Sequence, residues 1–165
     1  MFQNGGLMDN YWEGKRVLIT GGAGFIGSNL AEDLVNCGAV LRLVDNLERG
    51  RYAYIEAIAD QVEFVRLDLR DYDNCLQATK DIDIIIHLAS KVGGIGFYQN
   101  RSFEVMSDNM RIDTNMIQAA LQENVNRFLY ASSAHVYPLE LQMSPECPLI
   151  SEEEATPADP DLSYG

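Results

Sequence analysis

The sequence predicts an α/β protein built on a doubly wound parallel sheet. Short apolar runs alternate with segments whose apolar residues recur at helical spacing, which is typical of consecutive βαβ units. A glycine-rich turn follows the first apolar run, and an acidic residue follows the second. The chain has 165 residues, enough for one sizeable core and too few for a second full domain.

The strands and helices are expected in strict alternation. The strands are continuous apolar runs, as suits strands buried on both faces of a parallel sheet: Arg16–Thr20, Val40–Val44, Val62–Leu67, Ile82–Leu88 and Arg127–Ala131. The helices lie between them: one marked by Ile26, Leu30 and Leu34 and ending near Gly38, one around Tyr54–Ala59, one near Tyr72–Lys80, and a longer one with an apolar face of Met106, Met110, Ile117 and Leu121.

The two ends of the chain differ from this pattern. Residues 1–13 are predicted to be a flexible leader before a domain over 14–165. From Pro138 onward the sequence becomes an acidic, proline-bearing loop, and it stops at Ser163–Gly165 with no further strand or helix. We therefore expect a C-terminal truncation that removes the last strands of the sheet and the substrate domain.

Composition excludes several classes of function. The net charge of −13 gives no support to binding nucleic acid or an anionic membrane. The N-terminus has neither a signal peptide nor a membrane span. Three widely spaced cysteines, Cys37, Cys75 and Cys147, predict no metal site or disulfide framework and fit a reducing cytoplasm.

The glycine-rich turn carries the first functional signal. Gly21, Gly24 and Gly27 lie between a predicted strand and a predicted helix. In a Rossmann fold the first glycine permits a tight turn, the second lets the backbone approach a pyrophosphate, and the third allows close helix–strand packing. The helix N-terminus adds N–H donors and a positive dipole. The turn therefore predicts a dinucleotide site.

Asp45 indicates which dinucleotide binds. It lies 18 residues after Gly27, at the end of the second predicted strand. A carboxylate there accepts hydrogen bonds from the adenosine ribose and repels a 2′-phosphate, which favours NAD over NADP. A turn-capping role before Asn46 is the alternative, and Arg49 and Arg51 leave room for NADP.

The GxxGxxG spacing, Asp68-Leu69 after the third strand and His87-Leu88-Ala89-Ser90 after the fourth resemble the extended short-chain dehydrogenase/reductase family. By that resemblance Asp68 and Leu69 flank the adenine, and Ala89 lies along the cofactor. His87 is expected only to pack and form hydrogen bonds. The cofactor contacts implied are Gly21, Gly24, Phe25, Ile26, Gly27, Asp45, Asn46, Asp68, Leu69, Leu88, Ala89 and Ser90.

The stretch from Tyr130 to Pro138 extends the resemblance to catalysis. In the family, a serine at the position of Ser133 hydrogen-bonds the reacting sugar hydroxyl. A Tyr-x-x-x-Lys motif there supplies an acid/base tyrosine and a lysine that lowers its pKa. Tyr164-Gly165 looks like the start of that motif, so the resemblance assigns catalysis to Ser133 and Tyr164.

The sequence is nearest to the branch that contains the GDP-mannose 3,5-epimerases and GDP-fucose synthases. Gly93, Gly94 and Ile95 match a substrate-contacting glycine stretch, although a flexible loop is the alternative. His135 stands two residues after Ser133, where that branch has an acid/base cysteine. Imidazole also moves protons near neutral pH, so His135 is a candidate catalytic residue whose alternative is local packing.

The resemblance implies an NAD-dependent epimerase or dehydratase that acts on a nucleotide-activated sugar through a transient ketone. It also implies a cytoplasmic homodimer in the full-length form, with this fragment itself a poor catalyst. Two alternatives remain open: an NADPH-dependent reductase/epimerase like GDP-fucose synthase, and a non-catalytic NAD-binding sensor or scaffold. The sequence leaves the sugar and the reacting carbon undetermined.

Overall fold

A computed structural model describes residues 9–93, 95–133, 136–138, 141 and 149–155. This part of the chain separates into two compact units, each described by itself. The larger unit comprises the residues up to Ser90 and the segment Arg111–Ala131, and the smaller comprises Lys91–Met110 and the residues from Ser132 onward. The single domain expected over 14–165 therefore contains two units.

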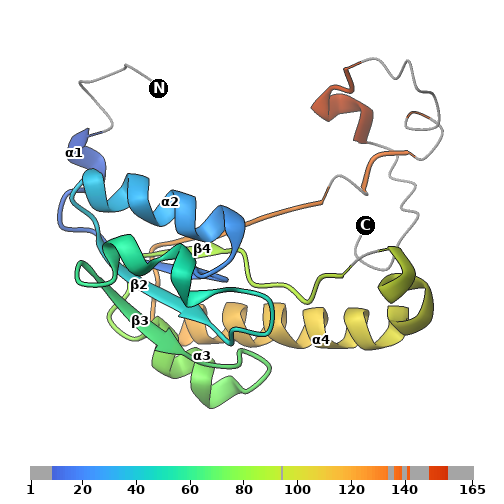
Figure 1. Ribbon diagram of the computed structural model, residues 1–165, viewed down its shortest axis with the longest axis horizontal. Helices are drawn as coiled ribbons and strands as arrows, with labels where there is room; N and C mark the ends of the chain where they lie inside the picture. Colours follow the sequence, from blue (N-terminus) through green and yellow to red (C-terminus); the bar gives the residue numbers. More distant parts are fainter. Residues whose placement is uncertain (1–8, 94, 134–135, 139–140, 142–148, 156–165) are drawn as a thin grey trace. The chain divides into compact units, whose positions relative to one another are not determined.

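The larger unit holds a five-stranded parallel sheet in the order β3-β2-β1-β4-β5 (Figure 1). The strands are β1 (Arg16–Thr20), β2 (Val40–Asp45), β3 (Val62–Arg66), β4 (Ile84–His87) and β5 (Arg127–Tyr130). The doubly wound sheet predicted from the sequence is confirmed. The strand order reverses between β1 and β4, and ligands of such sheets bind where the order reverses, beside the carboxyl ends of the strands.

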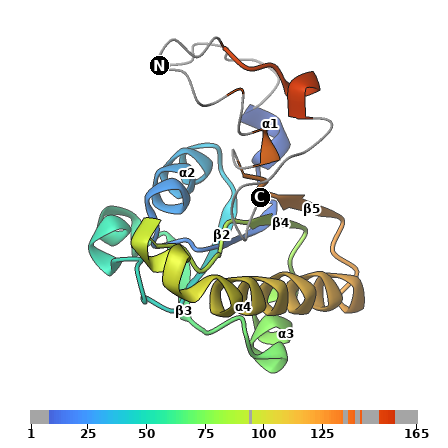
Figure 2. The same cartoon turned by 90° about the vertical axis from the view of Figure 1, so that its right-hand side faces the viewer.

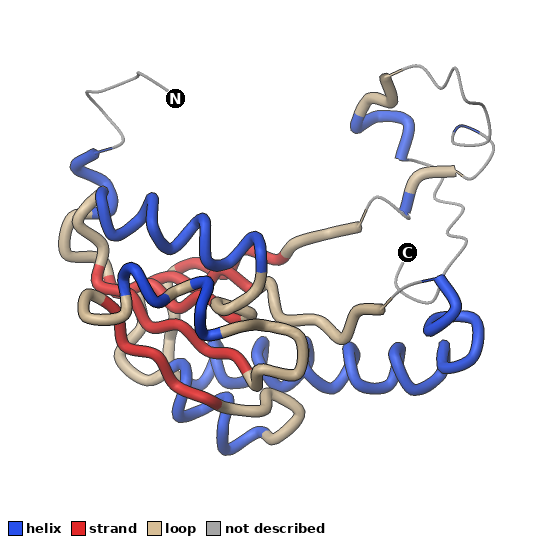
Figure 3. Tube along the Cα trace, in the orientation of Figure 1, coloured by secondary structure: helices blue, strands red, loops and turns tan. Residues whose placement is uncertain are grey.

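The helices of this unit cover the two faces of the sheet (Figures 2 and 3). Helix α2 (Phe25–Asn36) packs on one face, and α3 (Tyr72–Thr79) with the C-terminal part of α4 (Ile95–Gln122) packs on the other. Alternate residues of β1 supply both cores: Val17 and Ile19 face α2, whereas Leu18 faces α3 and α4. This arrangement explains why the central strands β1 and β4 are apolar without alternation.

Two short segments differ from the sequence predictions. Instead of one helix near Tyr54–Ala59, the chain forms two 3₁₀ turns, η1 (Tyr52–Tyr54) and η2 (Glu56–Ile58). Ile55 and Ile58 are both buried, and their spacing of three matches the three residues per turn of a 3₁₀ helix. Asp9–Trp12, expected in the leader, forms the short helix α1, and Trp12 packs against the core.

Helix α4 has two apolar sides, and the buried one is not the face marked in the sequence. Its buried apolar residues are Val105, Met116, Ala119 and Ala120. The face marked in the sequence is 44–74% exposed: Met106, Met110, Ile117 and Leu121. Helix α4 is apolar on two sides, and periodicity detects such sides without saying which of them packs inward.

Candidate functional site: the carboxyl edge of the sheet

The glycine turn joins β1 to α2. Gly21 has a φ of +68°, a left-handed conformation that favours glycine, and its carbonyl accepts a hydrogen bond from Gly24 N–H at 3.0 Å. A Cβ on Gly27 would lie 2.4 Å from the Gly21 oxygen. Gly21 and Gly27 are therefore required by the fold itself, one for the turn and the other for close packing.

Gly24 is different, because the fold does not require a glycine there. It has an ordinary φ of −80°, and a Cβ would approach only the Gly21 oxygen, at 3.1 Å. Gly24 is the N-cap of α2, and no side-chain hydrogen bond caps that end of the helix. A side chain at Gly24 would instead extend into the space before the helix N-terminus, where N–H groups and the dipole attract anions. This arrangement fits the pyrophosphate of a dinucleotide.

Asp45 lies beside this turn, at the end of β2. Its Oδ2 accepts the Ala23 N–H at 3.1 Å, and its Oδ1 accepts the Leu47 N–H at 2.8 Å. A carboxylate offers about four acceptor positions, so about two remain for ribose hydroxyls. The sequence analysis placed Asp45 at this site and gave turn capping as its alternative role, which the Leu47 contact shows. It missed the Ala23 contact, which ties the end of β2 to the glycine turn.

Gly50 is a site residue that the sequence analysis missed. A Cβ on Gly50 would lie 2.6 Å from Asp45 Oδ2, so the segment after β2 passes directly against that carboxylate. Arg51 N–H also donates to Ala23 O at 2.9 Å. A glycine five residues after the strand-end acid was the available signal for this close approach.

An open hollow of about 500 Å³ lies beyond the ends of β2 and β3. It contains two of the predicted cofactor contacts, Asn46 and the adenine-flanking Asp68. Its complete lining is Asn46, Leu47, Glu48, Arg66, Leu67, Asp68 and Arg70. Leu69, also predicted there, is 5% exposed and packs in the core with α3 and α4, whereas Leu67 lines the hollow.

The charges around the hollow are paired. Arg70 Nε donates to both oxygens of Asp68, at 2.9 and 3.1 Å, and this side-chain hydrogen bonding is the main cause that lowers the pKa of Asp68. Glu48 lies 4.0 Å from the same guanidinium, and Arg66 Nε donates to Asn46 O at 3.2 Å. The Asp68 carboxylate is therefore ionised and held in place at neutral pH.

The turn after β4 lies against the glycine turn. A Cβ on Gly21 would be 3.1 Å from the backbone of Leu88 and Ala89. The N–H groups of both residues donate to Thr20 Oγ1, at 3.0 Å each. The structure therefore brings the predicted contacts Leu88 and Ala89 beside Gly21, and Ser90 follows them as an exposed residue.

The smaller unit carries the predicted substrate and catalytic residues. Gly93 is half-buried and Ile95 begins α4. Ser133 is half-buried, and its backbone carbonyl accepts a hydrogen bond from Val136 N–H at 3.3 Å. Gly94, His135 and Tyr164 lie outside the described residues.

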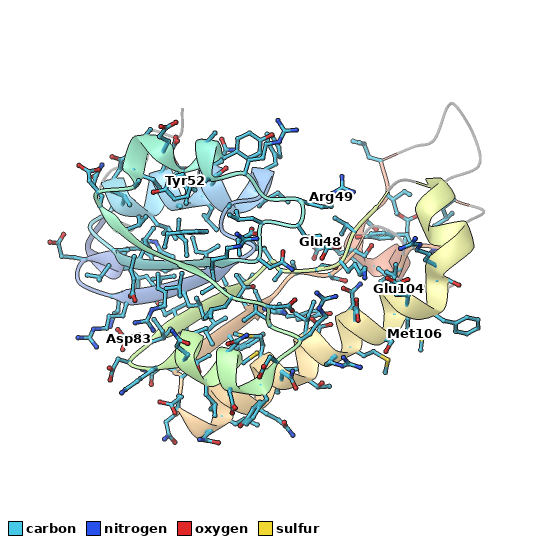
Figure 4. The ribbon with its side chains drawn as sticks, turned by 60° about the horizontal axis from the view of Figure 1, so that its bottom comes forward. Glu48, Arg49, Tyr52, Asp83, Glu104 and Met106 are labelled. Carbon is cyan, nitrogen blue, oxygen red and sulfur yellow. The ribbon has the colours of Figure 1, made fainter. Side chains whose placement is uncertain are left out.

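The segment before Gly93 is anchored to α4. Lys91 Nζ donates to Glu104 Oε1 and Asp108 Oδ2, both at 2.7 Å, and the Lys91 N–H donates to Asn109 Oδ1 at 2.6 Å. Asp108 and then Glu104 raise the pKa of Lys91. Figure 4 shows Glu104 on this part of α4, and the sequence analysis gave no role to this cluster.

Comparison with known proteins assigns the family. The model of the NAD dependent epimerase/dehydratase family matches residues 17–165. The chain belongs to this family. NAD is the cofactor of the family, and the described glycine turn, α2 N-terminus and Asp45 fit a dinucleotide at the edge of the sheet.

Relatives of known activity cover nearly all of this chain. GDP-mannose 3,5-epimerase of Arabidopsis thaliana is 35% identical over 159 residues, which are 95% of this chain and 41% of the relative. The UDP-Glc/GlcNAc 4-epimerase of Campylobacter jejuni superposes with a TM-score of 0.78 at 30% identity, covering 92% of this chain and 45% of that one. The UDP-glucose 4-epimerase of Thermus thermophilus, solved with NAD, superposes with a TM-score of 0.73 at 30% identity. The match covers 90% of this chain and 46% of that one.

The chain thus spans about 41–46% of the length of these relatives. Within the described residues, no helix is long and apolar enough to cross a membrane. The same residues contain no group of three or more His, Cys, Asp or Glu side chains that could hold a metal ion.

Proposed function

We propose that the whole protein is an NAD-dependent epimerase or dehydratase that acts on a nucleotide-activated sugar through a transient ketone. One observation carries the proposal: a glycine turn with an open position at Gly24 meets the Asp45 carboxylate, in a chain of the epimerase/dehydratase family. Gly21, Gly24, Gly27 and Asp45 would hold the cofactor. When bound, NAD supplies a reversible hydride acceptor for the sugar carbon.

The chain's own residues would move the protons. Tyr164 takes the proton of a sugar hydroxyl, and Ser133 orients that oxygen while it becomes a ketone. The ketone acidifies the neighbouring C–H bonds, and His135 carries a proton to or from one of these carbons. A free tyrosine has a pKa of about 10, so Tyr164 needs a nearby cation to act as a base at neutral pH.

Solvent isotope exchange tests this mechanism in the whole protein. Nucleotide sugars are supplied in deuterium oxide, beginning with GDP-mannose because the Arabidopsis relative is a GDP-mannose 3,5-epimerase. Deuterium should enter carbons next to the ketone. His135→Ala should slow this exchange by roughly 10²–10⁴ while the hydride transfer at the oxidised carbon survives. Tyr164→Phe should abolish both.

Each variant has a result that contradicts its assignment. Unchanged deuterium exchange in His135→Ala would remove His135 from the mechanism. Absence of exchange even in the parent protein would instead favour oxidation at one carbon, as in 4-epimerisation. Sugar conversion by Tyr164→Phe at the parent rate would overturn the mechanism itself. Net consumption of NADPH would indicate the reductase alternative, and NAD binding without any sugar conversion would indicate the sensor or scaffold.

We also propose that the whole protein forms a homodimer in the cytoplasm. Supporting the dimer, α4 carries an exposed apolar stripe that includes Met110, Ile117 and Leu121. Supporting the compartment, Cys37 and Cys75 are free thiols, as is usual in a reducing environment. Light scattering of the whole protein should give twice the monomer mass, and a concentration-independent monomer would refute the dimer.

A further inference from the structure

A line of hydrogen bonds crosses the larger unit and ends at the cofactor edge. Thr20 Oγ1 lies 2.8 Å from His87 Nδ1, and His87 Nε2 lies 3.0 Å from Asp113 Oδ1. Tyr130 OH donates to Asp113 Oδ2 at 2.7 Å. Thr20 is fully buried and His87 is 2% exposed, so β1, β4, α4 and β5 are joined through a polar line inside the fold.

The direction of each hydrogen bond follows from counting protons. Thr20 Oγ1 accepts the N–H groups of Leu88 and Ala89, which occupies both of its acceptor positions. Its own hydrogen must therefore point to His87 Nδ1, which then carries no proton. The imidazole proton lies on Nε2 and is donated to Asp113. The result is a neutral imidazole in a single tautomer.

This line fixes the turn after β4. With its hydrogen drawn toward His87, the Thr20 hydroxyl directs its lone pairs at Leu88 N–H and Ala89 N–H. Leu88 N–H is shared with Thr20 O at 3.3 Å, whereas Ala89 N–H has no other acceptor within the described residues. The same two residues lie against Gly21, in the turn that approaches the cofactor. An incorrectly oriented hydroxyl would let this turn move into the cofactor space.

We propose that Thr20, His87 and Asp113 are positioning residues for the cofactor, which act by holding the Leu88–Ala89 turn. The proposal rests on the NAD site proposed above. It assigns His87 a defined task beyond packing, although His87 touches no reacting atom. A purely structural role predicts lower stability without a matching loss of cofactor affinity, so the two quantities must be measured together.

The test measures NAD affinity by calorimetry and stability by thermal unfolding in the same variants. Thr20→Val keeps the side-chain shape and removes the hydroxyl, so NAD should bind about tenfold more weakly. Thr20→Ser retains the hydroxyl and should restore affinity to within about twofold. Thr79→Val is the matched control: Thr79 is fully buried on α3 and donates to Cys75 O at 2.9 Å, so its loss should lower stability alone.

A nuclear magnetic resonance spectrum of the imidazole nitrogens gives a readout independent of the cofactor. The chain has two histidines, so His135→Gln leaves His87 as the only signal. At neutral pH the proton should reside on Nε2, and a proton on Nδ1 would overturn the proposal whatever the variants do. Unchanged NAD affinity in folded Thr20→Val would overturn it while leaving the NAD site intact. Failure of the unaltered chain to bind NAD would instead refute the proposed NAD site, and this inference would then fail too.

Discussion

Gly24→Val should weaken NAD binding strongly while lowering the stability of the fold only slightly. The backbone at Gly24, with φ −80° and ψ 173°, suits valine. The added Cβ would meet only the Gly21 oxygen, at 3.1 Å, which requires a shift of a few tenths of an ångström. Replacing a glycine N-cap by an apolar residue costs about 1 kcal/mol. In a chain of this size, that lowers the melting temperature by about 2–4 °C.

The effect on cofactor binding should be much larger. The valine would fill the space before α2 and separate the pyrophosphate from the N–H groups of the helix. Hydrogen bonds to charged groups contribute about 1.5–3 kcal/mol each. Losing two of them raises the Kd for NAD by about 10²–10⁴. Calorimetric titration gives the affinity, and thermal unfolding gives the stability.

Gly27→Ala is the control variant, in which lower stability of the fold should be the main effect. Its Cβ would lie 2.4 Å from the Gly21 oxygen and 2.9 Å from the Gly22 Cα, and both contacts are with backbone. Overpacking of this kind should lower stability by about 1–3 kcal/mol. A folded Gly24→Val protein that binds NAD like the parent would refute the assignment of the pyrophosphate to this turn.

Three further predictions follow from single side chains. NAD(H) should bind more tightly than NADP(H), because Asp45 would face the 2′-phosphate with like charge; tighter NADP(H) binding in calorimetry would contradict this role. The hydrogen bond to Asp113, and then burial, raises the pKa of Tyr130 from 10.0 to about 12. The neutral phenol therefore stabilises the fold below pH 10, and this stabilisation is lost as the pH rises through 12. Tyr130→Phe should therefore lower the free energy of unfolding by about 1 kcal/mol at pH 9, and denaturant titrations should show the gap closing toward pH 12; a constant gap would argue against the bond. Burial raises the pKa of the Cys75 thiol to about 12, so in Cys147→Ser protein a thiol reagent should modify Cys37 well before Cys75, and equal rates would contradict this burial.

The sequence predicts the fold well because its central strands β1, β2 and β4 are buried on both faces. Such strands, β1 for example, must be continuous apolar runs, and Gly21 and Asp45 then fall at strand ends by position alone. The segment after Asp45 was harder to predict. Its path depends on the Ala23, Leu47 and Gly50 contacts with one carboxylate, and the Ala23 contact joins residues 22 apart in the sequence.

Two parts of the site could not be predicted for physical reasons. Thr20 looks like an ordinary strand residue, and only the parallel pairing of β1 with β4 brings its hydroxyl to His87 and the Leu88 N–H. Helix α4 has apolar residues on both sides, so its periodicity did not distinguish buried Met116 from exposed Ile117. Both outcomes are decided by tertiary neighbours rather than by local sequence.

We propose that NAD bound at this edge serves a redox-neutral change of a nucleotide sugar in the whole protein. The most direct measurement supplies the whole protein with NAD and a nucleotide sugar, then quantifies the sugar products and NADH together. The expected result is a converted sugar, an epimer or a dehydration product, with no net change in NAD. NADH that accumulates in proportion to the sugar consumed would contradict it, as would NAD binding without conversion of any nucleotide sugar.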